Sequence, residues 1–100
     1  MAPQVIHVER VEETKEPLVF CVTVSEDQSE TKYNVTLPQS VYQRLTQGKV
    51  TPERCVQAAF QFLLDREPKE SILKNFDVTV ISNYFPAFQR EIGKYLRQGG

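Results

Sequence analysis

The sequence has no long apolar run. Its longest uninterrupted stretch of apolar side chains, residues 18–22, is too short to span a bilayer. The amino terminus has neither the basic start nor the apolar core of a secretion signal. Both absences predict a protein that stays in the cytoplasm and does not enter a membrane.

Residue types that commonly carry chemistry are scarce as well. The chain of 100 residues has two cysteines, one histidine and four glycines. Cys21 and Cys55 lack both the close spacing of a metal knuckle and the density of a disulfide scaffold, so both are expected to be small core residues. The glycines form no phosphate-binding loop, and the acidic residues lack the periodicity of a calcium loop. We therefore expect no cofactor, no metal site and no catalytic activity. The enzyme alternative would need a polar pocket that holds His7 or Cys21 beside acidic residues.

The composition is that of one folded domain, residues 1–100. Apolar residues make up 40% of the chain and charged residues 25%, both ordinary for soluble globular proteins. The net charge is −1, but residues 1–37 carry three basic and seven acidic side chains, whereas residues 38–100 carry nine and six. This balance lacks the strong positive field of a dedicated nucleic-acid binder, so nucleic acid is not the expected partner.

The first part of the chain, residues 4–37, predicts a three-stranded antiparallel meander. Residues 5–11 alternate between apolar and polar side chains, as in a half-buried strand. Residues 18–24 are rich in β-branched side chains and apolar on both faces, as in a central strand. After a polar turn, residues 32–37 alternate again, so the second and third strands should form a hairpin.

The second part, residues 38–98, predicts three to five helices packed against that meander in an α+β fold. Apolar side chains recur at helical spacing just after Pro38. Thr51 and Pro52 then mark the start of a second helix, because a hydroxyl caps the first turn and proline suits its first position. This helix, from Pro52 to Arg66, is apolar around most of its circumference, and we expect it to lie across the sheet.

The segment after Pro68 is harder to assign. We predict a helix that begins at Pro68, with Ile72, Leu73 and Phe76 as its apolar face. Residues 77–85 combine strand propensity with the apolar spacing of a helix, and between these two interpretations we favour the helix. An amphipathic terminal helix follows Pro86.

The third strand and the two helices after it, KYNVTLPQSVYQRL and TPERCVQAAFQFLL, resemble the ribbon-helix-helix family of DNA-binding proteins at residues 32–64. The resemblance implies a dimer whose paired strands enter the major groove, with the start of the second helix on a phosphate. By position, the residues that would contact DNA are Lys32, Asn34, Thr36, Thr51 and Arg54. The strand already has a predicted hairpin partner, so DNA binding is the alternative and not the expected function.

Two further resemblances are local. The final residues, Leu96 to Gly100, resemble the end of ubiquitin-like modifiers and sulfur carriers, which implies a glycine tail that an activating enzyme would thread. Here the glycines follow a helix, so this carrier function is a remote alternative. The tract REPKESILKNFDVTVISNYFPAF is similar to one in small uncharacterised bacterial proteins, a similarity that spans about residues 54–92 and implies no function.

The expected function is that of a small protein-binding or adaptor module. Aromatic side chains gather near the end of the chain, where they either pack in the core or anchor an interface. The candidate contact residues are the anchors Tyr84, Phe85 and Phe88 and the basic rim Arg90, Lys94 and Arg97. The partner is an unidentified protein or a second copy of the chain, since Val19 and Cys21 on the second face of the central strand would need cover.

Overall fold

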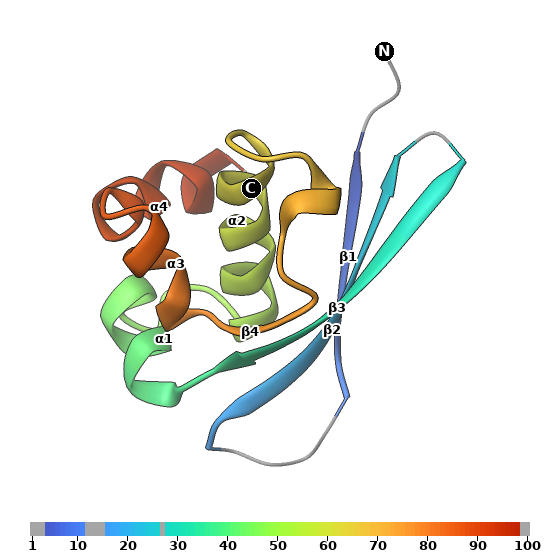
Figure 1. The fold of residues 1–100 in the computed structure, drawn as a ribbon. Coiled ribbons are helices and arrows are strands. Elements are labelled where there is room, and N and C mark those ends of the chain that lie inside the picture. Colours follow the sequence, from blue (N-terminus) through green and yellow to red (C-terminus); the bar gives the residue numbers. More distant parts are fainter. Residues whose placement is uncertain (1–3, 12–15, 27, 99–100) are drawn as a thin grey trace.

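The computed structural model describes residues 4–11, 16–26 and 28–98, with no description of the side chain of Gln98. One four-stranded mixed sheet carries all the helices on the same face, which confirms the predicted α+β class (Figure 1). The elements in chain order are β1 (Val5–Arg10), β2 (Leu18–Glu26), β3 (Ser29–Leu37), α1 (Gln39–Thr46), α2 (Pro52–Leu64), the short 3₁₀ helix η1 (Lys69–Ser71), β4 (Asn75–Asp77), α3 (Thr79–Tyr84) and α4 (Phe88–Gln98).

The predicted antiparallel meander is confirmed. β1 pairs with β2 from Val5 opposite Ser25 to Arg10 opposite Phe20, and β2 pairs with β3 along its whole length. Alternate side chains of β2, from Leu18 to Val24, are buried beneath the helices, and those between them are half-buried on the open face. Burial alternates along β2 because successive side chains of a strand point to opposite faces of the sheet, and the helices cover one face only.

The helix predicted from Pro68 through Phe76 is wrong. Only one 3₁₀ turn forms there, and the chain then continues as β4, which lies parallel to β3. The amide of Asn34 donates to the carbonyl oxygen of Lys74 at 2.7 Å, and the amide of Val78 donates to that of Thr36 at 2.9 Å. Without the β4 segment, the amide of Asn34 and the carbonyl oxygen of Thr36 would lose these backbone partners. Pairing with β3 therefore makes residues 75–77 a strand, although their local pattern suggested a helix.

Side chains on the open face fasten β4 as well. The side-chain amide of Asn34 donates through Nδ2 to Oδ1 of Asn75 at 3.0 Å, and the hydroxyl of Thr36 donates to Oδ2 of Asp77 at 2.6 Å. Asp77 also accepts hydrogen bonds at Oδ1 from the amide and the hydroxyl of Thr79, at 3.0 and 2.6 Å. The carboxylate of Asp77 therefore bonds to the last part of β3 and to the first residue of α3. The helix favoured for residues 77–85 is confirmed for its part Thr79–Tyr84.

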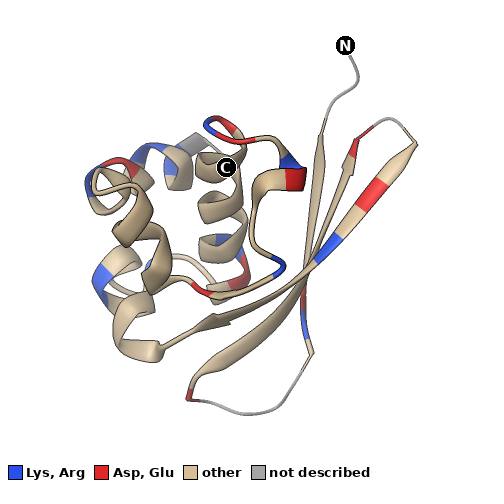
Figure 2. Ribbon diagram, viewed as in Figure 1, with Lys and Arg blue, Asp and Glu red and all other residues tan. Residues whose placement is uncertain are grey.

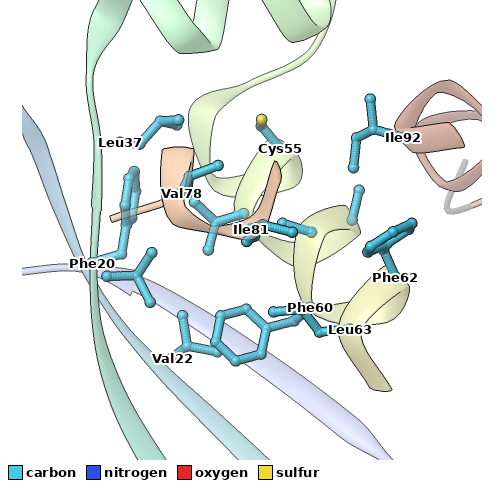
Figure 3. Close-up of a cluster of buried hydrophobic side chains, with 14 of the residues drawn as sticks. Phe20, Val22, Leu37, Cys55, Phe60, Phe62, Leu63, Val78, Ile81 and Ile92 are labelled. Carbon is cyan, nitrogen blue, oxygen red and sulfur yellow. The ribbon is translucent and has the colours of Figure 1, made fainter. Parts of the chain in front are cut away.

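Helix α2 is the centre of the core, as its nearly all-round apolar pattern predicted. Its hydroxyl cap is the expected one, with Oγ1 of Thr51 accepting from the amide of Arg54 at 3.1 Å. Phe60 points toward the sheet and Phe62 toward α4 (Figure 3). Burial raises the pKa of the Cys55 thiol to about 12, so this cysteine is a neutral core side chain, as expected.

A buried lysine fixes η1 to the sheet. Lys69 is only 3% exposed, and its ammonium donates to the hydroxyl of Thr31 and to the carboxylate of Glu70, each at 3.0 Å. The hydroxyl of Tyr33 donates to the carbonyl oxygen of Lys69 at 2.5 Å. Burial raises the pKa of Tyr33, and the hydrogen bond from Lys69 lowers the pKa of Glu70. These contacts hold the chain between α2 and β4 in one position.

Two arginines of the α2 region hold α4. The guanidinium of Arg54 donates to the carbonyl oxygens of Tyr95 and Leu96, at 2.6 and 3.3 Å, near the end of that helix. Arg66 forms an ion pair with Glu91 at 2.8 Å. A cation beside terminal carbonyls stabilises a helix end.

Candidate functional site

Large apolar side chains are exposed at four places in the described part of the chain. They are Val5 (57% exposed), Val11 (46%), Leu73 (52%) and Tyr84 (67%). Leu73 and Tyr84 belong to one apolar groove, whereas Val5 begins β1 and Val11 directly follows its last residue. Exposed apolar side chains that gather at a hollow are typical of an interaction site.

The groove lies where the end of α2, η1, β4 and α3 meet. Its volume is about 250 Å³. Buried or half-buried apolar side chains form most of its surface, and the side chains that line it are Leu63, Glu67, Ser71, Ile72, Leu73, Phe76, Val80, Ile81, Tyr84 and Phe85. Two of the lining residues, Glu67 and Ser71, are polar and not aromatic.

The walls of the groove are set by the core. Phe76 packs against Phe60 of α2 with ring centroids 5.8 Å apart, and Phe85 meets Phe62 edge-on at 5.9 Å. Both aromatic walls are therefore fixed by side chains of one central helix. Such a groove can accept a ligand group without first being ordered, which lowers the entropic cost of binding.

The size and lining of the groove indicate the kind of ligand that it can hold. Sites for drug-sized ligands and cofactors usually enclose roughly 300–1,000 Å³ and include several converging polar groups. A volume of about 250 Å³ with an apolar surface is better matched to one or two bulky side chains. The geometry therefore suits a segment of another protein.

The predicted aromatic anchors divide between the groove and the core. Tyr84 and Phe85 line the groove, as candidate contact residues should. Phe88 is 1% exposed and packs edge-on against Phe62 with ring centroids 5.0 Å apart. Phe88 is therefore corrected from a contact residue to a core residue, because it cannot reach a partner without leaving the core.

The predicted basic rim lies elsewhere. Arg90, Lys94 and Arg97 are exposed, and none of them lines the groove. They belong to α4, whose ribbon carries both basic and acidic positions (Figure 2). The charged residue that does line it is Glu67. The three basic side chains thus form a solvated helix face in this chain.

The ribbon pairing implied by the family resemblance conflicts with the sheet. β3 lies between β2 and β4, and β4 pairs with its residues Asn34 to Thr36, which lie within the segment that would form the ribbon. On this strand Lys32 is exposed, whereas Asn34 and Thr36 are bonded to β4. Thr51 and Arg54 serve as a helix cap and a clamp on α4, so both have structural partners. Most of the residues that the resemblance assigns to DNA contact thus have partners within this chain.

The enzyme alternative depended on the surroundings of His7 and Cys21. His7 lines a second hollow of about 340 Å³ between β1 and α2, together with Ile6, Val8, Thr51, Glu53, Arg54 and Gln57. The imidazole of His7 has no hydrogen bond with another described residue. Cys21 is half-buried on the open face, between Glu9 and Asn34 in the register. Within residues 4–11, 16–26 and 28–98, no three His, Cys, Asp or Glu side chains are grouped as metal ligands.

Three comparisons were made with known proteins. No protein-family model, no curated protein and no solved structure matches the chain. Among the described residues, no helix is long and apolar enough to cross a membrane. Gly99 and Gly100 lie outside the described residues.

Sequence reasoning missed most of the groove. Leu63, Phe76 and Val80 face it from three different elements, and the sequence gives no spacing that relates them. One local signal was present, because Asp77 followed two residues later by Thr79 is typical of a turn that opens a helix. That signal marks the start of α3 and therefore the end of β4.

Proposed function

We propose that this chain is a protein-binding module that takes one bulky aliphatic or aromatic side chain of a partner segment into the groove. The observation that carries the proposal is the position of Leu73 and Tyr84. Each exposes more than half of its surface, at 52% and 67%, beside a hollow of about 250 Å³. Burying such side chains contributes about 1.5–3 kcal/mol each, a large share of the affinity of a short peptide.

The polar lining suggests how the partner segment is oriented. Ser71 and Glu67 are the polar groups in the groove, and Glu67 has no side-chain hydrogen bond or ion pair with a described residue. A carboxylate next to an apolar pocket favours a cation or a hydrogen-bond donor beside the buried side chain. The expected partner segment therefore carries a large apolar residue with a basic or amide neighbour.

A random peptide library displayed on phage tests the proposal, followed by fluorescence anisotropy of the selected peptides. The variants Leu73→Ser and Tyr84→Ser should each weaken binding about tenfold, because each removes apolar contact area at the rim. The matched control is Val5→Ser, which truncates an equally exposed side chain far from the groove in the strand order.

The peptides selected from the library, and their affinity for the variants, can support or contradict the proposed groove binding. Selected peptides that lose affinity for both groove variants and bind Val5→Ser as well as the unchanged chain would support the proposal. A library that yields no binder would contradict it, as would peptides that bind both groove variants with unchanged affinity.

A further inference from the structure

β1 is an edge strand, and no other strand of the described residues pairs with its outer side. It pairs with β2 on one side only, and it keeps a continuous register over six residues without a bulge. Edge strands are usually protected by proline, charged side chains, a bulge or very short length; Val5–Arg10 has no proline, no lysine and no bulge, and its two charged residues, Glu9 and Arg10, lie together at its end. The opposite edge strand, β4, has only three residues. The two edges of this sheet are therefore protected to different degrees.

The hydrogen-bond pattern shows which backbone groups face outward. The amide of Val11 donates to the carbonyl oxygen of Val19 at 3.2 Å. Because hydrogen-bonded pairs alternate along an antiparallel ladder, the odd residues of β1 bond to β2, and the backbone groups of Ile6 and Val8 point away from it. The second hollow runs beside these groups, since Ile6 and Val8 line it. The edge thus has both unpaired backbone groups and space beside them.

We propose that the edge of β1 binds the same edge of a second copy, antiparallel and with Val8 on the two-fold axis. In this register Val8 exchanges backbone hydrogen bonds with Val8 of the second copy. His7 then lies directly opposite Glu9 of the second copy, and Val5 lies opposite Val11. The result is a continuous eight-stranded sheet across two chains.

The side chains select this register over its neighbours. The outward backbone groups belong to even residues, so odd residues face each other as non-hydrogen-bonded pairs, in which side chains lie closest. With Val8 on the axis, both exposed valines of β1 gain an apolar neighbour, and the histidine gains an acidic one. An axis through His7 would place His7 opposite itself and Val5 opposite Glu9. An axis through Glu9 would place two carboxylates together, which is destabilising.

A second copy is therefore a better occupant than an unrelated strand. The edge is complementary to itself in charge and in apolar surface, and a two-fold interface requires that self-complementarity. The interface is independent of the groove, because β1 and β4 lie at opposite ends of the strand order. Failure of one proposal would leave the other unaffected.

Disulfide formation between two different variants tests the register. In the background Cys21→Ser, which removes the half-buried thiol opposite position 9, we would prepare His7→Cys and Glu9→Cys. A mixture of the two should form a cross-linked dimer under mild oxidation, whereas each variant alone should not, because facing pairs bring the two β-carbons within disulfide range. Lys32→Cys, exposed on β3, is the control for random collisions.

Sedimentation across a concentration series tests the association itself. The unchanged chain should approach the mass of two chains, and the double variant Val5→Lys with Val11→Lys should raise the dissociation constant about tenfold or more, because lysines would then face each other. Its circular dichroism should stay unchanged, since both valines are exposed. The mass of one chain at every concentration would overturn the proposal. Cross-linking of His7→Cys or Glu9→Cys with itself in preference to the mixture would overturn it too.

Discussion

The two edges of the sheet differ in length and in the apolar surface beside them. β4 is three residues long, and its Phe76 forms a wall of the groove that Leu73 and Tyr84 border. β1 is six residues long, and Val5 and Val11 are exposed at its ends. The four large apolar side chains that are exposed among the described residues therefore divide equally between two sites.

The two sites differ in what they can bind. The groove beside β4 has walls fixed by core aromatic rings, so it can take up a side chain. The edge of β1 has outward backbone groups, so it can take up a strand. Apolar side chains of similar exposure can thus bind different partners, a side chain at the groove and a strand at β1, because the groups around them differ.

The largest expected difference between the edges concerns stability. Phe76→Ala should lower the free energy of unfolding by about 2–3 kcal/mol, because the half-buried ring packs on Phe60, whereas Val8→Ala should cost about 1 kcal/mol. Urea unfolding should be measured in the background of the two lysine substitutions on β1, so that association does not contribute. Equal losses would show that the two edges are equally coupled to the core.

A charge exchange sharpens the comparison at β1. His7→Glu should raise the dissociation constant of the dimer about fivefold to tenfold, because it places a carboxylate opposite Glu9 twice in each dimer. The double exchange, His7→Glu with Glu9→His, should restore the original dissociation constant. Sedimentation equilibrium measures both, and a double variant as weak as the single one would argue against the proposed register.

A smaller effect is expected from the polar contacts that hold β4. Thr36→Val removes the 2.6 Å hydrogen bond to Asp77 and should cost about 1 kcal/mol. Hydrogen exchange should become faster at the amides of Asn34 and Val78, which bond across the β3–β4 pair, and stay the same at Val11. Thr23→Val is the control. The hydroxyl of Thr23, on β2, lies on the same face of the sheet as Thr36 and has no side-chain hydrogen bond to a described residue. Faster exchange at all three amides would mean that β4 does not open separately.

The smallest expected effect is in the core that both edges share. Burial raises the pKa of Cys55 from its ordinary 9.0 to about 12, so the thiol ionises more readily in the unfolded chain. Its contribution to stability is complete below the ordinary pKa and is lost as the pH rises through the folded value. Between pH 8 and 9, below the ordinary pKa of 10.0 for tyrosine, the loss should be about 0.4 kcal/mol. Cys55→Ala should remove this slope, and a slope that persists would assign it to another group.

The sequence predicted the elements whose pattern is local and long. The β-branched apolar run in residues 18–24 and the cap at Thr51 each specified a structure within one stretch of chain, and the meander and α2 formed as expected. β4 could not be predicted in the same way, since three residues are too few to show a period. The groove was only partly predictable, because Tyr84 and Phe85 stood out as aromatic residues while Leu63 and Val80 did not.

By itself, the sequence determined the α+β class, with a meander and a central apolar helix, because side-chain periodicity and capping act between residues close along the chain. Only the tertiary structure decided that Phe88 is buried while Tyr84 is exposed, since Phe88 packs against Phe62 of α2 and Tyr84 lies at the groove. It also decided which strand keeps an open edge. Both outcomes depend on contacts between segments that are far apart in the sequence, and a local sequence pattern carries no information about such contacts.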